Sequence, residues 1–219
     1  MEVRDYEPED IQFGTRLHGA LEAFDFVSAG GSEYDAHMKK LMEIDSNSGQ
    51  AVKKAIETLL TSNIHQSLGL SRKAATKEVR IAHCIRLTDK DTNVTMKDKL
   101  DLMLADSSGR ITIVDYKTNY PDAGGRWEDF VRSHYAHQLA AYKLALEDGA
   151  GFDVERTCIL NYNRARNEWK LHDVDTASLE LGKRLLDMLP LKVQDGGLSK
   201  RQRDDFCMKM CQFRELCWP

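Results

Sequence analysis

The sequence predicts an α/β fold with a mixed central sheet flanked by helices. Apolar residues recur at helical spacing through the first third of the chain, and from Val79 they alternate with the two-residue period of strands before helical spacing returns. The length of 219 residues suits one domain. We expect it over residues 10–198, with a flexible arm at 1–9 and a basic, cysteine-containing tail at 199–219 packed on the same domain.

The order of elements follows from these apolar patterns and from the residues that interrupt them. We expect helices at residues 11–26, 33–44, 50–64 and 128–147, and a last helix that Asp175 caps and that ends before Pro190. We expect strands at residues 79–86, 99–105, 110–116, 157–162 and 168–171. Three strands, a helix and two further strands fit a mixed sheet with helical cover.

Composition and charge exclude several classes of protein. No apolar run approaches the roughly 20 residues that a membrane helix needs, and the acidic start of the chain does not resemble a signal peptide. The odd number of five cysteines argues against a secreted disulfide framework. We therefore expect a cytoplasmic or nuclear protein without a membrane partner. The net charge of -4 leaves a nucleic-acid partner to a local patch.

The apolar stretch from Ile111 to Lys117 ends in a carboxylate and an amine. Asp115 and Lys117 lie two residues apart, so on a strand their side chains leave the same face. This pair is a candidate site for a metal ion and an activated water, and an exposed ion pair is the ordinary alternative. Glu168 and Lys170 repeat the spacing after a polar turn, and we interpret them as a solvated hairpin face.

A second carboxylate, Asp101, lies on the preceding predicted strand. A three-residue loop at 107–109, with a type I turn and Gly109 in the left-handed conformation, would bring Asp101 opposite Asp115. A two-residue loop would separate the two carboxylates, so we predict the longer form. Two facing carboxylates and the backbone carbonyl of Tyr116 would give a divalent cation several oxygen ligands, and Lys117 could orient the attacking water.

Other polar side chains are candidates for the same site. His18 lies on the first predicted helix and could complete a metal shell, although a surface or core histidine is the ordinary interpretation. Gln138 and Tyr142 share one helix face, which also suits a surface glutamine beside a half-buried tyrosine. Trp127 follows the loop after the strand and could stack on unpaired bases, as could Tyr135, for which core packing serves equally well.

In their order along the chain, these residues resemble the RecB-type nuclease domain of the PD-(D/E)XK superfamily, which includes the AddA and AddB nuclease domains. The resemblance covers roughly residues 13–163. It departs from the family where Met96-Lys97-Asp98-Lys99 replaces a usual glycine, although the strand parity of Asp98 favours Asp101 as the ligand. The matching motifs are Gly-Thr-x-x-His-x-x-Leu-Glu at 14–22, Glu78, Leu-Asp-Leu at 100–102, Ile-Val-Asp-Tyr-Lys-Thr at 113–118 and Gln-x-x-x-Tyr at 138–142.

The resemblance implies a restriction-endonuclease-like core and an enzyme that hydrolyses DNA phosphodiester bonds with Mg²⁺ or Mn²⁺. An exonuclease or end-processing enzyme in recombination, repair or phage replication is the favoured form, acting on single strands or duplex ends beside recombination or helicase proteins. The alternative is a catalytically silent nucleic-acid-binding or assembly subunit that keeps the fold. The resemblance assigns His18, Asp101 and Asp115 as metal ligands, Lys117 as the water-orienting residue, and Gln138 and Tyr142 as supports on the DNA side.

The cysteines near the C-terminus extend the resemblance. AddB-like and CRISPR-associated exonuclease-like members bind a [4Fe-4S] cluster at a similar C-terminal group, with two residues in the first gap where this chain has three. Their fourth ligand precedes the helical histidine, and no cysteine precedes His18, so Cys84, Cys158 or a non-cysteine ligand would have to substitute. Zinc, or thiols without a metal, are the alternatives. The C-terminal cysteines are Cys207, Cys211 and Cys217.

Overall fold

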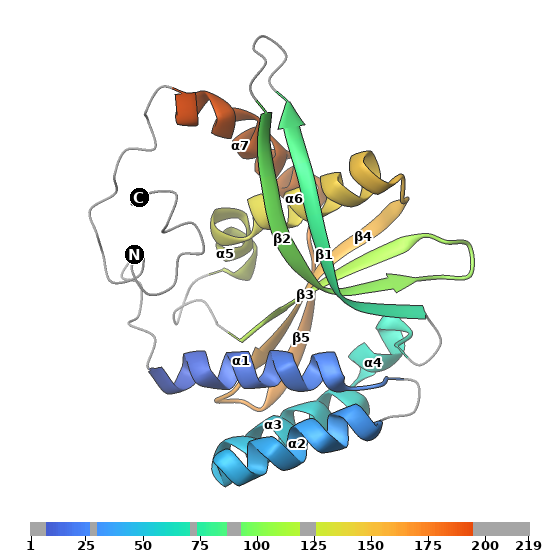
Figure 1. Ribbon diagram of the computed structural model, residues 1–219, viewed down its shortest axis with the longest axis vertical. Helices are drawn as coiled ribbons and strands as arrows, with labels where there is room; N and C mark the ends of the chain where they lie inside the picture. Colours follow the sequence, from blue (N-terminus) through green and yellow to red (C-terminus); the bar gives the residue numbers. More distant parts are fainter. Residues whose placement is uncertain (1–7, 27–29, 71–73, 87–92, 119–125, 195–219) are drawn as a thin grey trace.

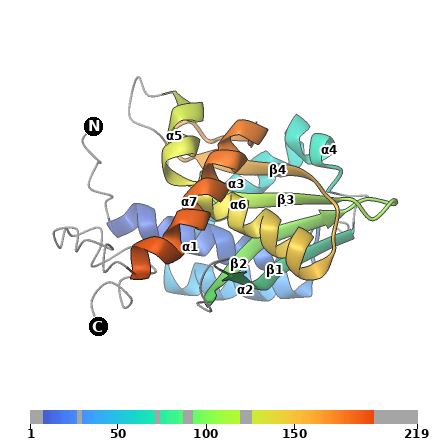
Figure 2. The same ribbon diagram turned by 90° about the horizontal axis from the view of Figure 1, so that it is seen from above.

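The structure is a computed structural model that describes residues 8–26, 30–70, 74–86, 93–118 and 126–194. Helices cover both faces of one sheet (Figures 1 and 2). One layer contains α1 (Pro8–Ala23), α2 (Ser32–Ile44), α3 (Ser46–Thr61) and α4 (Asn63–Leu68). The other contains α5 (Trp127–His134), α6 (Ala136–Leu144), the π-helical turn η1 (Ala145–Gly149) and α7 (Thr176–Gln194).

The central sheet has five strands in the order β1-β2-β3-β4-β5. Strands β3 and β4 form a parallel pair, and the α5–α6 segment makes the crossover that such a pair requires. The other neighbours are antiparallel, so the sheet is mixed and the α/β prediction is confirmed. The strands are β1 (Ala74–Arg86), β2 (Asn93–Ala105), β3 (Ile111–Lys117), β4 (Val154–Asn163) and β5 (Glu168–Asp173).

The hairpin between β2 and β3 has the predicted three-residue loop. Asp106 and Arg110 pair across it, with the Asp106 N–H donating to the Arg110 carbonyl at 3.0 Å. Gly109 closes the turn by donating to the Asp106 carbonyl at 3.0 Å, and its φ of 83° is the left-handed conformation that glycine adopts without strain. The Asp106 carboxylate accepts the N–H groups of Ser108 and Arg110, which fixes the loop from within.

Several predicted boundaries move in the structure. Helix α1 begins at Pro8, inside the expected arm. Proline is tolerated there because an N–H in the first turn has no acceptor within the helix. Asp45 caps α3 by accepting the N–H of Ser48 at 3.1 Å, so this helix starts before residue 50. The last helix was wrongly expected to end before Pro190, and α7 instead continues to Gln194. Its predicted cap is confirmed, since Asp175 accepts the N–H of Ser178 at 2.7 Å.

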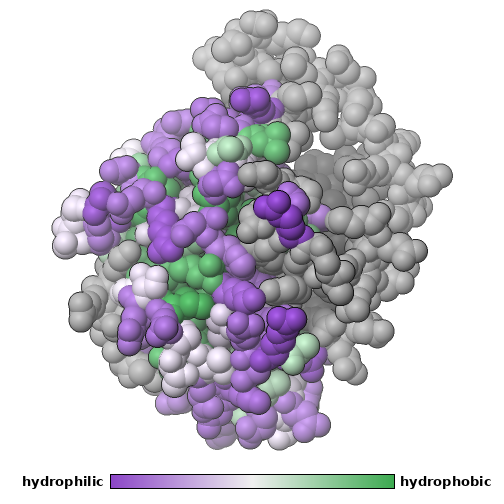
Figure 3. All heavy atoms as spheres, turned by 180° about the vertical axis from the view of Figure 1, so that it is seen from behind, coloured by the Kyte–Doolittle hydropathy of each residue, from purple (hydrophilic) through white to green (hydrophobic). Residues whose placement is uncertain are grey.

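The two faces of the sheet bury separate apolar clusters. The cluster under α1 to α4 contains apolar residues of β2, β3, β4 and β5, and the cluster under α5 and α6 contains Leu100, Ile113 and Ile159. Asp115 is one of few charged side chains buried among them. None of the helices in the described part of the chain is long and apolar enough to cross a membrane. On the face seen in Figure 3, apolar side chains form limited patches among hydrophilic ones.

Candidate active site

The two carboxylates meet where β2 and β3 separate. Leu102 pairs with Val114, and continuing this register by one residue places Asp101 opposite Asp115. Instead of a further ladder bond, the Asp101 Oδ2 atom accepts the backbone N–H of Tyr116 at 2.8 Å. The carboxylate therefore fills the gap that opens between the two strands.

The carbonyl of Tyr116 has a defined direction. In a strand, the N–H and C=O of one residue point to the same side, and the N–H of Tyr116 points to Asp101 on β2. The Tyr116 carbonyl is therefore directed to the same side, beyond the last ladder pair of β2 and β3. Its ring is buried on the other face, where it packs edge to face with His18 at a centroid distance of 5.7 Å.

Asp115 is a buried carboxylate paired with one cation. Its Oδ2 atom lies 2.6 Å from Lys117 Nζ as an ion pair, and no second donor among the described residues bonds that oxygen. Burial raises the pKa of Asp115, the charge of Lys117 lowers it and the charge of Asp101 raises it, with a net result of about 6. A second cation beside this oxygen would stabilise its charged form.

Asp101 has the opposite electrostatic balance. Burial raises its pKa, but the contact with His18, the N–H of Tyr116 and the charge of Lys117 together outweigh burial and hold the pKa below its usual value. The His18 Nδ1 atom lies 3.4 Å from Asp101 Oδ1. Asp101 is therefore ready to act as an anion in a site where Asp115 resists ionisation.

Helix α1 brings His18 to the carboxylates through a close approach at Gly14. A Cβ atom on Gly14 would lie 2.8 Å from Oγ1 of Thr118, the residue after Lys117. Only a glycine lets α1 come this near to the end of β3 without displacing the threonine. His18 lies about one helical turn further along, beside Asp101.

Gln138 and Tyr142 support Lys117 from α6. Gln138 Oε1 accepts from Lys117 Nζ at 3.4 Å, and Gln138 Nε2 donates to the Tyr142 hydroxyl at 2.5 Å. The Tyr142 hydroxyl donates in turn to the Lys99 carbonyl at 3.0 Å. Tyr142 is 1% exposed, so in this structure its side chain lies in the core behind Gln138, and its predicted role on the DNA side stays a prediction.

The donor set fits a hard divalent cation. Carboxylate oxygens, a backbone carbonyl and one imidazole are ligands that Mg²⁺ or Mn²⁺ accepts, and Asp115 Oδ2 has no hydrogen-bond donor among the described residues besides its ion pair with Lys117. Within the described residues, no three His, Cys, Asp or Glu side chains form a preformed metal cage. The Tyr116 carbonyl, water or substrate oxygens would therefore have to complete the shell.

Other predicted site residues are placed less fully. Trp127 is the first residue of α5, and its side chain lies outside the described part, as do Cys207, Cys211 and Cys217. Cys84 lies on β1 opposite Thr95. Cys158 is a buried free thiol that donates to the Ile113 carbonyl, which suits a structural role better than ligation.

Sequence reasoning missed two contributions to this site, from Gly14 and Tyr135. Glu78 keeps no assigned role: the register places it between Lys77 and Val79, whose partners flank Asp101, and its side chain lies outside the described part. Gly14 was quoted in a motif, but its close approach to Thr118 needs the tertiary structure. Tyr135 was considered only for base stacking or core packing, and its ring lies against the Lys117 ammonium.

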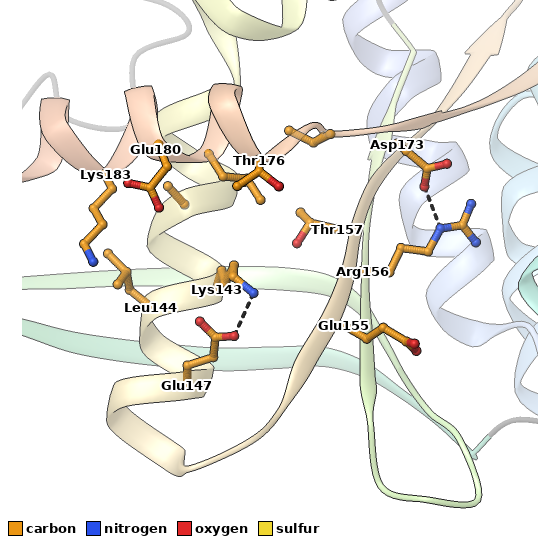
Figure 4. Close-up of a pocket in the computed structure, with 13 residues that line it drawn as sticks. Lys143, Leu144, Glu147, Glu155, Arg156, Thr157, Asp173, Thr176, Glu180 and Lys183 are labelled. Atoms are coloured by element: carbon orange, nitrogen blue, oxygen red, sulfur yellow. Dashed lines mark hydrogen bonds and ion pairs between the residues drawn. The ribbon is translucent and has the colours of Figure 1, made fainter.

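A cavity of about 530 Å³ lies away from these residues, between α6, α7 and the strands β4 and β5 (Figure 4). Two ion pairs border it, Lys143 with Glu147 at 2.7 Å and Arg156 with Asp173 at 2.5 Å. The charges on its wall are mixed, so it offers no cationic surface to a phosphate backbone. The carboxylate site is therefore the better candidate for chemistry on nucleic acid.

The fold and the site together define an α/β protein with two carboxylates and a lysine around the end of a central strand. The chain belongs to the PD-(D/E)XK nuclease superfamily, whose family model matches residues 2–218. Membership implies hydrolysis of nucleic acid, and these nucleases generally use divalent metals. The comparison with curated proteins found no match.

A solved structure supports the fold. A protein of Eubacterium rectale named "Putative exonuclease" superposes with a TM-score of 0.58 at 16% sequence identity, over 89% of this chain and 71% of that chain. SSO0001 gives a TM-score of 0.40 at 13% identity, over 95% of each chain, which is too low to carry an argument. At these identities the likeness extends to the fold alone.

Proposed function

We propose that this protein is a metal-dependent deoxyribonuclease that hydrolyses phosphodiester bonds, with exonuclease or end-processing activity favoured. The observation that carries the proposal is the contact between Asp115 and Lys117 beside Asp101, in which a fully buried carboxylate is held against an ammonium group at 2.6 Å. Burying a charged group in this way costs stability, and groups of this kind are concentrated at functional sites. The name of the Eubacterium rectale protein agrees with an exonuclease but does not decide it.

Each residue has a role in this proposal. Asp101, Asp115 and the Tyr116 carbonyl would hold Mg²⁺ or Mn²⁺, and His18 would complete the shell or orient Asp101. The bound ion would polarise the scissile phosphate and lower the pKa of a water molecule. The Lys117 ammonium would orient that water and offset the charge that develops on the phosphate.

The principal test is cleavage of end-labelled single-stranded and double-stranded DNA with Mg²⁺ or Mn²⁺, with matched RNA as a comparison. We expect Asp115→Ala and Lys117→Ala to abolish cleavage while the proteins stay folded. Lys170→Ala is the matched control, because Lys170 forms the same sequence pattern with Glu168 as an exposed pair at 3.8 Å. Near-normal activity of both site variants would refute the assignment.

A catalytically silent nucleic-acid-binding or assembly subunit is the competing function. Both carboxylates and the lysine are present, Asp115 and Lys117 are in contact, and a subunit without activity has no need to bury Asp115 as a charged group. DNA binding by wild-type protein without cleavage in either metal would favour the silent subunit. Partner recombination or helicase proteins remain part of the proposal for either function.

The C-terminal cysteines support a separate proposal. Cys207, Cys211 and Cys217 would hold a [4Fe-4S] cluster or zinc, with Cys84 as the candidate fourth ligand. A cluster would give anaerobically purified protein a brown colour and an absorbance at about 400 nm. Bound zinc would give neither. Metal analysis of wild-type protein and of Cys211→Ser tests it, and equal metal content in both would argue against it.

A further inference from the structure

In the described part of the chain, three contacts of the Lys117 ammonium are defined. Asp115 Oδ2 lies at 2.6 Å and Gln138 Oε1 at 3.4 Å. The third is the ring of Tyr135, whose centroid lies 4.8 Å from Nζ. The family motifs include the lysine, the aspartate and the glutamine, and they leave the tyrosine without a role.

The backbone of Tyr135 is fixed at the junction of two helices. It ends α5 by donating its N–H to the Val131 carbonyl at 2.8 Å, and its carbonyl accepts the N–H of Leu139 at 3.0 Å in α6. Its φ of -122° and ψ of -16° lie outside the helical range, so the chain changes direction at this residue. The break separates the two helices next to the end of β3.

The ring of Tyr135 is supported from its own layer. It packs edge to face on Phe130 at a centroid distance of 5.6 Å and an interplanar angle of 77°. Tyr135 is the residue before α6 and precedes Gln138 by three residues along the chain. The ring and the amide therefore contact the same ammonium group from neighbouring positions.

We propose that Tyr135 is a positioning residue, whose ring face holds the Lys117 ammonium in the orientation that the hydrolytic site requires. A lysine side chain has several freely rotating bonds, and the ion pair with Asp115 alone leaves its angle of approach loosely defined. The negative face of an aromatic ring attracts a cation, more strongly when the pair is shielded from water. The Lys117 side chain is only 17% exposed.

This inference rests on the proposed nuclease activity. It predicts that the rate of cleavage depends on the electron density of the Tyr135 ring. Stacking of Tyr135 on an unpaired base is the competing role. The contact with Lys117 uses a face of the ring that a base would otherwise need. Loss of a stacking residue would weaken substrate binding, whereas loss of a positioning residue would slow cleavage of bound substrate.

The test is single-turnover cleavage at saturating enzyme, together with DNA affinity measured in Ca²⁺ to prevent turnover. We expect Tyr135→Phe to retain the wild-type rate within about 2-fold and Tyr135→Leu to lose about 5- to 30-fold, with unchanged affinity. Replacing Tyr135 by phenylalanines of increasing fluorination should lower the rate step by step, because fluorine withdraws charge from the ring face. Phe152→Leu, the same kind of change at an exposed aromatic residue before β4, is the control and should retain the rate.

A second measurement does not depend on activity. The ε-methylene protons of Lys117 should show an upfield ring-current shift in ¹H–¹³C spectra of wild type and Tyr135→Phe that disappears in Tyr135→Leu, with Lys117→Arg to assign the signal. An inactive wild-type protein would refute the proposed nuclease activity. The ring-current shift would still test the contact between Tyr135 and Lys117. An active wild type with a rate insensitive to leucine or to fluorination, or with a weakened affinity alone, would overturn the positioning role.

Discussion

Asp101 accepts the backbone N–H of Tyr116 at 2.8 Å, and this bond replaces the next rung of the ladder between β2 and β3. The same carboxylate lies beside His18 and opposite Asp115. One side chain thus closes a gap in the sheet and offers an oxygen to the candidate metal site. Its structural role and its proposed chemical role can be separated by substitution.

Asp101→Ala should lower the free energy of unfolding by about 1–3 kcal/mol, because it leaves the N–H of Tyr116 without an acceptor in a partly buried position. Asp101→Asn keeps an oxygen for that N–H and should cost less, while both variants lose metal-dependent cleavage. Urea unfolding without metal, followed by circular dichroism, measures the difference. Equal stability of the alanine variant and wild type would show that the N–H of Tyr116 finds another partner.

Asp115→Asn should have the opposite effect on stability. Burial raises the pKa of Asp115 to about 6 in the folded protein, from an ordinary value of 3.8. Between these values the folded protein keeps a proton that the unfolded chain releases, so the stability contributed by this group falls as pH rises through the window and stays low above it. Asparagine removes the cost, and we expect metal-free Asp115→Asn to be more stable than wild type by about 1–3 kcal/mol at pH about 7.5.

The difference between Asp115→Asn and wild type should shrink toward zero at pH about 3, below the ordinary value of 3.8, where the wild-type residue is protonated in both the folded and the unfolded state. Added Mg²⁺ or Mn²⁺ should raise the melting temperature of wild type and leave that of the variant unchanged, because the ion stabilises the charged carboxylate. Thermal melts in EDTA and in metal, at both pH values, measure this. A variant less stable than wild type at neutral pH would mean that the contact with Lys117 outweighs the burial of Asp115.

Local sequence patterns predicted how Asp101, Asp115 and Lys117 are placed, because neighbouring residues determine that placement. The loop at 107–109 must place glycine where φ is positive, and this alone sets the register that opposes Asp101 to Asp115. The two-residue period placed Asp115 and Lys117 on one face, where the structure has their ion pair. Such features depend on neighbours in the sequence, so the sequence is sufficient to predict them.

Contacts between distant segments were beyond local patterns. The break at Tyr135 interrupts what the sequence presents as one helix, and the contact of its ring with Lys117 depends on how α5 and α6 pack on β3. The hydroxyl of the buried Tyr142 likewise donates to the carbonyl of Lys99, a residue 43 positions away in sequence. Helical spacing predicted that Gln138 and Tyr142 share a face, but not that this face meets the lysine.

Tyr142→Phe should slow cleavage through Gln138. The hydroxyl donates to the Lys99 carbonyl and accepts from Gln138, so its loss should cost about 1–2 kcal/mol of stability and loosen the amide that contacts Lys117. Tyr162→Phe is the matched control, because it removes a hydroxyl that bonds Asn167 at 2.7 Å outside this network. We expect similar losses of stability, with a several-fold lower cleavage rate in Tyr142→Phe alone. Equal rates in the two variants would argue against a path from Tyr142 to the lysine.

Gly109→Ala should destabilise the protein by about 1 kcal/mol through backbone strain alone. The φ of Gly109 is 83°, and a Cβ there would meet no atom within 4 Å, so steric contact adds nothing. Gly30→Ala is the matched control, since its Cβ would also be in open space and its φ is not in the positive region. Chemical unfolding of both variants measures the difference. A Gly109→Ala protein as stable as Gly30→Ala would mean that the hairpin adopts another turn, and the register of Asp101 with Asp115 would then lose its main local determinant.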